Sequence, residues 1–317
     1  MYKIVIIISI QLSFIFSQNV DEHFESSFSE NMDEFILKID DFPEIIFPKN
    51  DLYSAISSNS EWLRSAHLSS NFHEPGMLKA LIYIKQAGYK IENIVDIGSF
   101  YGYFSKVSES IFPNARIYAV EPNYDSYKIL EENSKYNKNK VNNIQCNFLA
   151  ISNDNQTNYK IFYGFDFLKL SIANLLNFGT RNFIKFLLRK SKSPLLKIWK
   201  LKEESLENFC KIRDITPDLI KIDVEGRQAL ILPPAYEYIL EARPIILLEF
   251  DSLEKLKQFN TSNESVIRPL LENGYRLYWG DHREQKCEFK EIKLLDLDQE
   301  QIDIEKDSLG ILIPDIR

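Results

Sequence analysis

The chain is poor in cysteine and histidine, with three and four among 317 residues. Cys146, Cys210 and Cys287 are odd in number and far apart, so they form neither a disulfide framework nor a metal motif. Cys146 and Cys210 lie in apolar-periodic segments, which favours packing in the core. The histidines are scattered without a pair at ligand spacing. We therefore expect no structural zinc or other metal site.

The chain also lacks an excess of positive charge. The net charge is −8, which does not favour nucleic acid as a partner. No internal repeat or low-complexity segment is evident. With 44% hydrophobic and 26% charged residues, the composition is that of a globular protein, long enough for one large α/β domain with appendages.

A third glycine is missing from the most informative segment, residues 94–104. An apolar strand ends here near Asp96, two glycines follow at Gly98 and Gly102, and a helical pattern begins. Strand, glycine turn and helix form the nucleotide-binding unit of doubly wound α/β domains. A dinucleotide site needs Gly-x-Gly-x-x-Gly, but Phe100 and Tyr103 stand at the second and third positions. The missing glycines therefore argue against one alternative function, that of a nicotinamide oxidoreductase.

The spacing Asp96-x-Gly98-x-x-x-Gly102 instead resembles motif I of S-adenosylmethionine (SAM) methyltransferases. The next strand, 116–121, ends in Glu121, where a carboxylate can accept from both ribose hydroxyls. The alternative is a tight turn followed by a surface glutamate. The resemblance implies SAM as cofactor and predicts these cofactor-binding residues: Asp96, Gly98, Ser99, Phe100, Gly102, Tyr103, Glu121, Ala150 and Asp223.

A second motif, Asp-Leu-Ile-Lys-Ile-Asp-Val-Glu-Gly at 218–226, lies between segments 204–209 and 244–250. Together they resemble the signature of FkbM-type methyltransferases, over roughly residues 90–255. That family has the Rossmann-like SAM-dependent fold and methylates hydroxyl oxygens on polyketides or sugars. Gln228 stands where the family usually has an acidic residue. This departure leaves open a catalytically degenerate protein that serves as an anchored binding or interaction module.

Strand and helix patterns alternate along the core. The predicted strands are 94–97, 116–121, 143–151, 218–223 and 244–250, with 275–279 and 309–313 as an antiparallel pair, and the predicted helices are 102–112, 124–136, 227–241 and 264–273. This pattern predicts an α/β protein, which the resemblance specifies as a Rossmann-like class I SAM-dependent methyltransferase fold: a mostly parallel seven-stranded sheet with helices on both faces. Five polar or small residues fall at predicted strand ends, where such sheets bind ligands: Asp96, Glu121, Ala150, Asp223 and Glu249.

The chain before the core differs in composition. Residues 1–18 carry a short apolar run, Ile4–Phe16, that fits a signal peptide or hydrophobic anchor. Residues 19–50 are acidic, and we expect an arm. Residues 51–317 are the predicted methyltransferase domain, which begins with helices and carries a basic helical insert at 165–202. A signal would place the protein in the secretory pathway or on a membrane; without one it would be cytoplasmic.

The basic insert has four cations that a helix would place on one face: Arg181, Lys185, Arg189 and Lys192. A basic amphipathic helix can contact an anionic membrane or cover an anionic substrate. A solvated surface helix is the alternative.

Methyl transfer to a hydroxyl requires removal of the hydroxyl proton. Lys221, Asp223 and Glu225 follow the strand at the cofactor edge and are the predicted catalytic residues, with one carboxylate as the base. The alternative is a structural polar network, and His282 is a second candidate base. The function that the sequence favours is O-methyl transfer to a hydroxylated small molecule, glycan, lipid or secondary metabolite.

Overall fold

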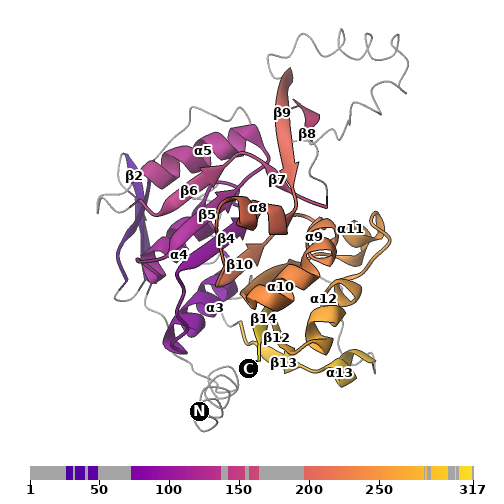
Figure 1. The fold of residues 1–317 in the computed structure, drawn as a ribbon. Helices are drawn as coiled ribbons and strands as arrows, with labels where there is room; N and C mark the ends of the chain where they lie inside the picture. Colours follow the sequence, from indigo (N-terminus) through magenta and orange to yellow (C-terminus); the bar gives the residue numbers. More distant parts are fainter. Residues whose placement is uncertain are drawn as a thin grey trace, which may run out of the picture.

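The computed structural model describes residues 26–30, 33–39, 42–48, 73–136, 142–153, 157–163, 196–281, 283, 287–298, 304 and 307–315. Its central sheet consists of β4 (Asn93–Ile97), β5 (Arg116–Val120), β6 (Ile144–Asn147), β10 (Leu219–Ile222), β11 (Ile245–Phe250), β12 (Tyr275–Gly280), β13 (Lys290–Ile292) and β14 (Ser308–Pro314). The strand order is β13-β12-β14-β11-β10-β4-β5-β6 (Figure 1).

Strands β6, β5, β4, β10 and β11 are parallel, and β14 is inserted antiparallel between β11 and β12. The chain passes outward from β4 to β6 and then returns to β10 on the other side of β4. This is the doubly wound, Rossmann-like topology, with its switch point between β4 and β10. The predicted sheet is confirmed, and an eighth strand, β13, is added at its edge.

Helices cover both faces of the sheet. They are α3 (Pro75–Gln86), α4 (Tyr103–Ile111), α5 (Tyr124–Lys135), α8 (Leu206–Ile212), α9 (Gln228–Ile231), η1 (Pro233–Ala235), α10 (Tyr236–Ala242), α11 (Leu253–Lys257), α12 (Asn263–Glu272) and α13 (Leu294–Asp298). Leu81, Val107 and Leu130 from α3, α4 and α5 pack in one apolar cluster. Phe209, Ile239 and Ile267 from α8, α10 and α12 pack in a second cluster. The central strands are mostly apolar because both faces of the sheet are covered.

Two predicted elements are divided in the structure. The predicted helix 227–241 is interrupted by Pro233 and Pro234, which form the short η1 between α9 and α10. A proline inside a helix removes a hydrogen-bond donor and clashes with the preceding turn. The predicted strand 143–151 ends as β6 at Asn147, and β7 (Ala150–Ile151) pairs with another sheet.

We expected an acidic arm at residues 19–50, of which the structure describes residues 26–30, 33–39 and 42–48. They form a three-stranded antiparallel sheet of β1 (Ser26–Glu30), β2 (Glu34–Ile39) and β3 (Ile45–Pro48). Phe35, Leu37 and Phe47 are buried in the same cluster as the apolar faces of α3 and α4. Acidic residues dominate the composition of the segment, but alternating apolar side chains in β2 decide its fold, because alternate residues share one face of a strand.

The basic insert is only partly described. β8 (Thr157–Tyr163) and β9 (Leu196–Glu204) form an antiparallel hairpin that projects from the body, and β9 also pairs with β7 (Figure 1). Residues 196–202 are therefore a strand, whereas the insert was predicted to be helical. The four cations of the predicted basic face lie outside the described residues, as do the predicted signal or anchor at 1–18 and His282.

Within the described ranges, no helix combines the length and apolar character needed to cross a membrane.

Candidate functional site

Two of the polar residues that the sequence places at strand ends, Asp96 and Asp223, lie on β4 and directly after β10, the neighbouring strands on either side of the switch point. The register pairs Lys221 of β10 with Asp96 of β4. Side chains two residues apart on a strand share a face, so Asp223 lies on the same side of the sheet as Lys221. These residues form one charged row at the carboxyl ends of the parallel strands, where such sheets bind ligands.

The glycine turn after β4 is held by backbone contacts. Gly98 has φ +79°, and a Cβ there would lie 1.8 Å from the carbonyl oxygen of Asp223. Gly102 has φ +80°, and a Cβ there would lie 2.6 Å from a methyl group of Leu130. We expected these glycines to make room for a ligand. The structure shows instead that the space of the missing side chains is filled by the protein itself.

Ser99 and Phe100 complete this turn. The Ser99 hydroxyl donates to the Asp96 carbonyl oxygen at 2.7 Å and accepts from the Val120 amide at 2.9 Å. Ser99 is buried, so its side chain acts in the turn itself. Phe100 has φ +48°, which non-glycine residues rarely adopt. This conformation directs the Phe100 amide to the Glu121 carboxylate at 2.8 Å.

Glu121 joins the ends of β4 and β5. Its two carboxylate oxygens accept from the amides of Phe100, at 2.8 Å, and Asn123, at 2.7 Å. Burial raises the pKa of Glu121 to about 7, although both hydrogen bonds and the charge of Lys221 lower it. A carboxylate has about four acceptor positions, so two further donors can bind.

An aromatic group follows β6, near the position predicted to contact adenine. The ring centroid of Phe148 lies 5.5 Å from that of Tyr124 and 5.3 Å from that of Tyr127. Ala150 is buried and pairs with Glu203 of β9. The structure thus places Ala150 in a second sheet just beyond these rings.

Lys221 is buried, and it is saturated with partners. Its ammonium lies 2.9 Å from the Gly98 carbonyl oxygen, 3.0 Å from Asp223 Oδ2 and 3.5 Å from Asp96 Oδ1. Burial lowers the pKa of Lys221, but Asp223 and Asp96 outweigh it, and the pKa is raised. Lys221 therefore stays charged, which excludes it as a proton acceptor and makes it the link between the glycine turn and β10.

Glu249, at the end of β11, contacts Asp223. Their side chains are hydrogen bonded, and burial together with Asp223 raises the pKa of Glu249 far above its ordinary value. Arg283 Nη2 lies 3.4 Å from Glu249 Oε1. The sequence placed Glu249 at a strand end but did not include it among the site residues. In the sequence, only the strand pattern pointed to Glu249. Its contact with Asp223 joins residues of two different strands, so it cannot be found from the local sequence.

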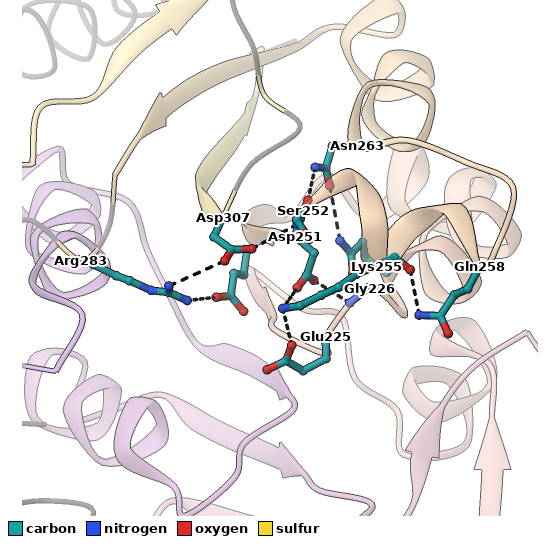
Figure 2. A network of polar contacts seen from close by, with 11 residues as sticks. Glu225, Gly226, Asp251, Ser252, Lys255, Gln258, Asn263, Arg283 and Asp307 are labelled. Carbon is teal, nitrogen blue, oxygen red and sulfur yellow. Dashed lines mark hydrogen bonds and ion pairs between the residues drawn. The ribbon is translucent and has the colours of Figure 1, made fainter. Parts of the chain in front are cut away.

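Glu225 belongs to a different network. Its side chain is 76% exposed and pairs with Lys255, which also binds Asp251 Oδ1 at 2.6 Å. Figure 2 shows Glu225, Lys255 and Asp251 pointing toward one another. Asp251 Oδ2 also accepts from the Gly226 amide at 2.6 Å. This network fixes the turn after β10.

Gln228 lies beneath the same network. It is buried, and its amide nitrogen is 3.4 Å from Asn263 Oδ1. The Asn263 side chain in turn donates to the carbonyl oxygens of Asp251, at 2.7 Å, and Ile304, at 3.0 Å. The departure from the family pattern at Gln228 therefore falls in a structural network, not in the row that contains Asp96 and Asp223.

The turn before α3 brings two residues that the sequence did not single out. The charges of Asp223, Lys221 and Arg283 all act on His73, whose imidazole is 3.6 Å from Glu74 Oε1. Burial lowers the pKa of His73 to about 4, which Asp223 opposes and Lys221 reinforces, so the ring is neutral at neutral pH. No motif marks a single histidine that lies more than 140 positions before Lys221 and Asp223 in the sequence.

Tyr103, predicted to bind cofactor, lies beside this turn. Its ring stacks on Phe47 at 5.8 Å and meets the edge of His73 at 5.4 Å. Burial raises the pKa of Tyr103, and the negative charge of Glu74 raises it further. Tyr103 thus joins the N-terminal sheet to the His73 side of the site rather than to Glu121.

Among the described residues, no group of three or more His, Cys, Asp or Glu side chains is placed to hold a metal ion.

Residues 86–277 match the methyltransferase FkbM domain. No curated protein matches the chain. Similar solved structures include methyltransferase FkbM from Methylobacillus flagellatus KT, with 11% identity and a TM-score of 0.41 over 70% of this chain and 43% of that chain. This protein thus spans less than half the length of the Methylobacillus protein.

Two further similar structures come from other bacteria. The SAM-dependent methyltransferase from Agrobacterium tumefaciens has 10% identity and a TM-score of 0.41, over 91% of this chain and 72% of that chain. The O-methyltransferase from Bacillus cereus in complex with SAH has 13% identity and a TM-score of 0.36, over 82% of this chain and 93% of that chain.

Proposed function

The chain belongs to the FkbM family of SAM-dependent methyltransferases, and from that premise we propose that it transfers a methyl group to a hydroxyl oxygen. The acceptor that we propose is a hydroxylated small molecule, glycan or lipid. The observation that carries the proposal is the charged row at the ends of β4 and β10, in which Lys221 lies 3.0 Å from Asp223. In this row, the partly exposed carboxylate of Asp223 lies beside the glycine turn after β4, which we propose binds the cofactor.

The residues at the ends of β4 and β5 fit the cofactor. The carboxylate of Glu121 retains acceptor positions for the two ribose hydroxyls. Asp96 Oδ1 is buried and accepts no hydrogen bond, although the Lys221 ammonium forms a long ion pair with it at 3.5 Å. A buried carboxylate oxygen in this state suits a cationic donor such as the α-ammonium group of SAM. Phe148, Tyr124 and Tyr127 offer an aromatic surface for the adenine ring.

When bound, SAM supplies an electrophilic methyl group on a sulfonium. The protein must hold the acceptor oxygen in line and remove its proton. Asp223 is the best-placed proton acceptor, because its side chain is 27% exposed and lies beside the glycine turn. Lys221 is positively charged, and Glu225 is directed to Lys255. We therefore assign Asp223 as the base and Lys221 as the residue that orients it.

Replacement of Asp223 by asparagine tests this assignment. The variant keeps the size and one acceptor oxygen but cannot take a proton. We expect turnover to fall by about a hundredfold or more, with SAM affinity nearly unchanged. The measurements are methyl transfer to a panel of hydroxylated acceptors, calorimetric titration with SAM and melting curves.

Three results would count against the proposal. Full activity of Asp223→Asn on an acceptor of the parent protein would remove Asp223 from the chemistry. A joint loss of stability and SAM binding would make the row structural. SAM binding by the parent without transfer to any acceptor would favour a degenerate binding module instead.

A further inference from the structure

Two carboxyl groups stand side by side at the ends of adjacent parallel strands. The register of β10 and β11 pairs Ile222 with Leu248, so the following residues, Asp223 and Glu249, are neighbours. Strands in a sheet are about 4.8 Å apart, which lets two acidic side chains on one face meet. Asp223 and Glu249 do meet, through a side-chain hydrogen bond.

A hydrogen bond between two carboxyl groups requires a proton on one of them, because an ionised carboxylate only accepts. Two like charges in contact also disfavour ionisation of both. Asp223 is 3.0 Å from the Lys221 ammonium and 27% exposed, so it is the better stabilised anion. Glu249 is 8% exposed and loses more hydration. The proton therefore lies on Glu249.

The surrounding charges agree with this distribution. Asp223, Glu74 and Asp251 all raise the pKa of Glu249, after burial as the largest cause. The other charged or titratable groups near the pair are Asp96, Lys221, His73, Arg283 and Asp307.

Within the described part of the chain, Arg283 is the cation that contacts Glu249 directly, but its guanidinium is 59% exposed and 3.4 Å away. This long contact with a half-hydrated guanidinium does not offset the burial of Glu249, whose pKa stays far above its ordinary value. A neutral carboxylic acid can also accept from Arg283 with its carbonyl oxygen while its hydroxyl donates to Asp223. The Arg283 contact is thus compatible with a protonated Glu249.

We propose that Glu249 is a positioning residue that, as a neutral carboxylic acid, donates a hydrogen bond to Asp223 and keeps it ionised and oriented toward the acceptor. The inference rests on the proposed function in one respect, that Asp223 takes the proton. Hydrogen bonding to the charged form of a carboxylate favours that form. Lys221 and Glu249 would then hold Asp223 from two sides.

The proton balance is simple. The acceptor oxygen forms a bond to the methyl carbon as the carbon–sulfur bond breaks, and the two electrons of that bond remain on sulfur. The hydroxyl proton passes to Asp223, while Glu249 keeps its own proton throughout. Asp223 is partly exposed and returns its proton to solvent before the next turnover.

Two substitutions at Glu249 distinguish a neutral donor from an anion. Glutamine keeps the shape, donates an N–H and cannot ionise, so Glu249→Gln should retain methyl transfer within about threefold of the parent. Alanine removes the donor, so Glu249→Ala should lose about ten- to thirtyfold, and the acidic limb of kcat/KM should move to higher pH. Glu254→Gln, an exposed site on α11 with the same charge change, is the matched control.

If Glu249→Gln is as impaired as Glu249→Ala, then Glu249 acts as an anion and the proposal is wrong. The same holds if Glu249→Ala keeps both the parental rate and the parental acidic limb, because the donor would then have no role.

A second measurement does not depend on methyl transfer. Because the pKa of Glu249 is raised in the folded state, the parent loses stability relative to Glu249→Gln as pH rises. Between pH 6 and 8 the melting temperature of the parent should fall relative to that of Glu249→Gln by about 2–4 °C per pH unit. If the difference in melting temperature between the parent and Glu249→Gln did not change with pH, Glu249 would be ionised in the folded protein. A parent without methyl transfer but with this slope would contradict the proposed function alone.

Discussion

The proposed cofactor end and the proposed acceptor end of the site are built in different ways. At the cofactor end, the turn after β4 and the end of β5 rely on backbone groups: glycines at positive φ and amides that donate to Glu121. At the acceptor end, side chains meet from separate elements: Lys221 and Asp223 from β10 and the residue that follows it, and Glu249 from β11. The cofactor end thus depends on the shape of the backbone, and the acceptor end depends on the charges of side chains. Substitutions should therefore affect stability and cofactor binding at one end and chemistry at the other.

The largest effect should come from Gly98→Ala at the cofactor end. The added Cβ would lie 1.8 Å from the Asp223 carbonyl oxygen, at φ +79°. Positive φ and the overlap together should lower the free energy of unfolding by about 3–5 kcal/mol. Denaturant unfolding measures this loss.

Gly88→Ala is the matched control for Gly98→Ala. Gly88 has φ +80°, and a Cβ at this position would have nothing within 4 Å, so the substitution should cost only about 1–2 kcal/mol of strain. Equal losses at both positions would mean that the contact with Asp223 has no energetic weight, and the distinction between the two ends would weaken.

The next effect is on SAM affinity. Glu121→Ala removes the group proposed to accept from the ribose and releases the Phe100 amide. The loss should be about 1.5–3 kcal/mol, or roughly ten- to a hundredfold in affinity by calorimetry. Glu237→Ala, at an exposed position on α10, serves as the control. An unchanged affinity for Glu121→Ala would disprove the ribose assignment.

The pH dependence of SAM binding should be a smaller effect. Burial raises the pKa of Glu121 to about 7, so a larger fraction of the protein carries the ionised carboxylate as pH rises from 6 to 8. Affinity should improve up to about tenfold across this range. Glu121→Gln should lack this part of the slope, because it cannot ionise. Identical slopes for parent and variant would place the titration on another group.

The smallest effect should be that of Glu225→Gln. Glu225 was one of the two carboxylates that the sequence offered as the base, but its side chain is 76% exposed and pairs with Lys255. Turnover should stay within about threefold of the parent, since exposed ion pairs contribute little. A loss comparable to that of Asp223→Asn would return Glu225 to the chemistry and extend the acceptor end beyond Asp223.

Much of the cofactor end could be predicted because its residues are close in sequence. Asp96, Gly98 and Gly102 lie within seven positions, and Glu121 follows at the end of the next strand. The same local patterns also gave the strand and helix order. They could not show that Gly98 packs against Asp223, since that contact joins residues more than 120 positions apart.

Composition was a weaker guide than pattern. The acidic character of residues 19–50 suggested an arm, yet Phe35 and Phe47 anchor this segment in the core. At the acceptor end, Lys221 and Asp223 were predicted, whereas His73 and Arg283 carry no motif. His73 lies within reach of the charges of Asp223, Lys221 and Arg283, and Arg283 contacts Glu249, only in the folded protein, because these residues are far apart in the sequence.

The sequence by itself determined the fold class and the family, because hydrophobic periodicity and short motifs are local properties of the chain. It also determined which carboxylates end the strands. Only the tertiary structure decided their roles. Strand register sets Asp223 beside Glu249, and burial among Lys221 and other charges fixes which of the two ionises. Ionisation depends on charges brought together from distant elements, and these distances exist only in the folded protein.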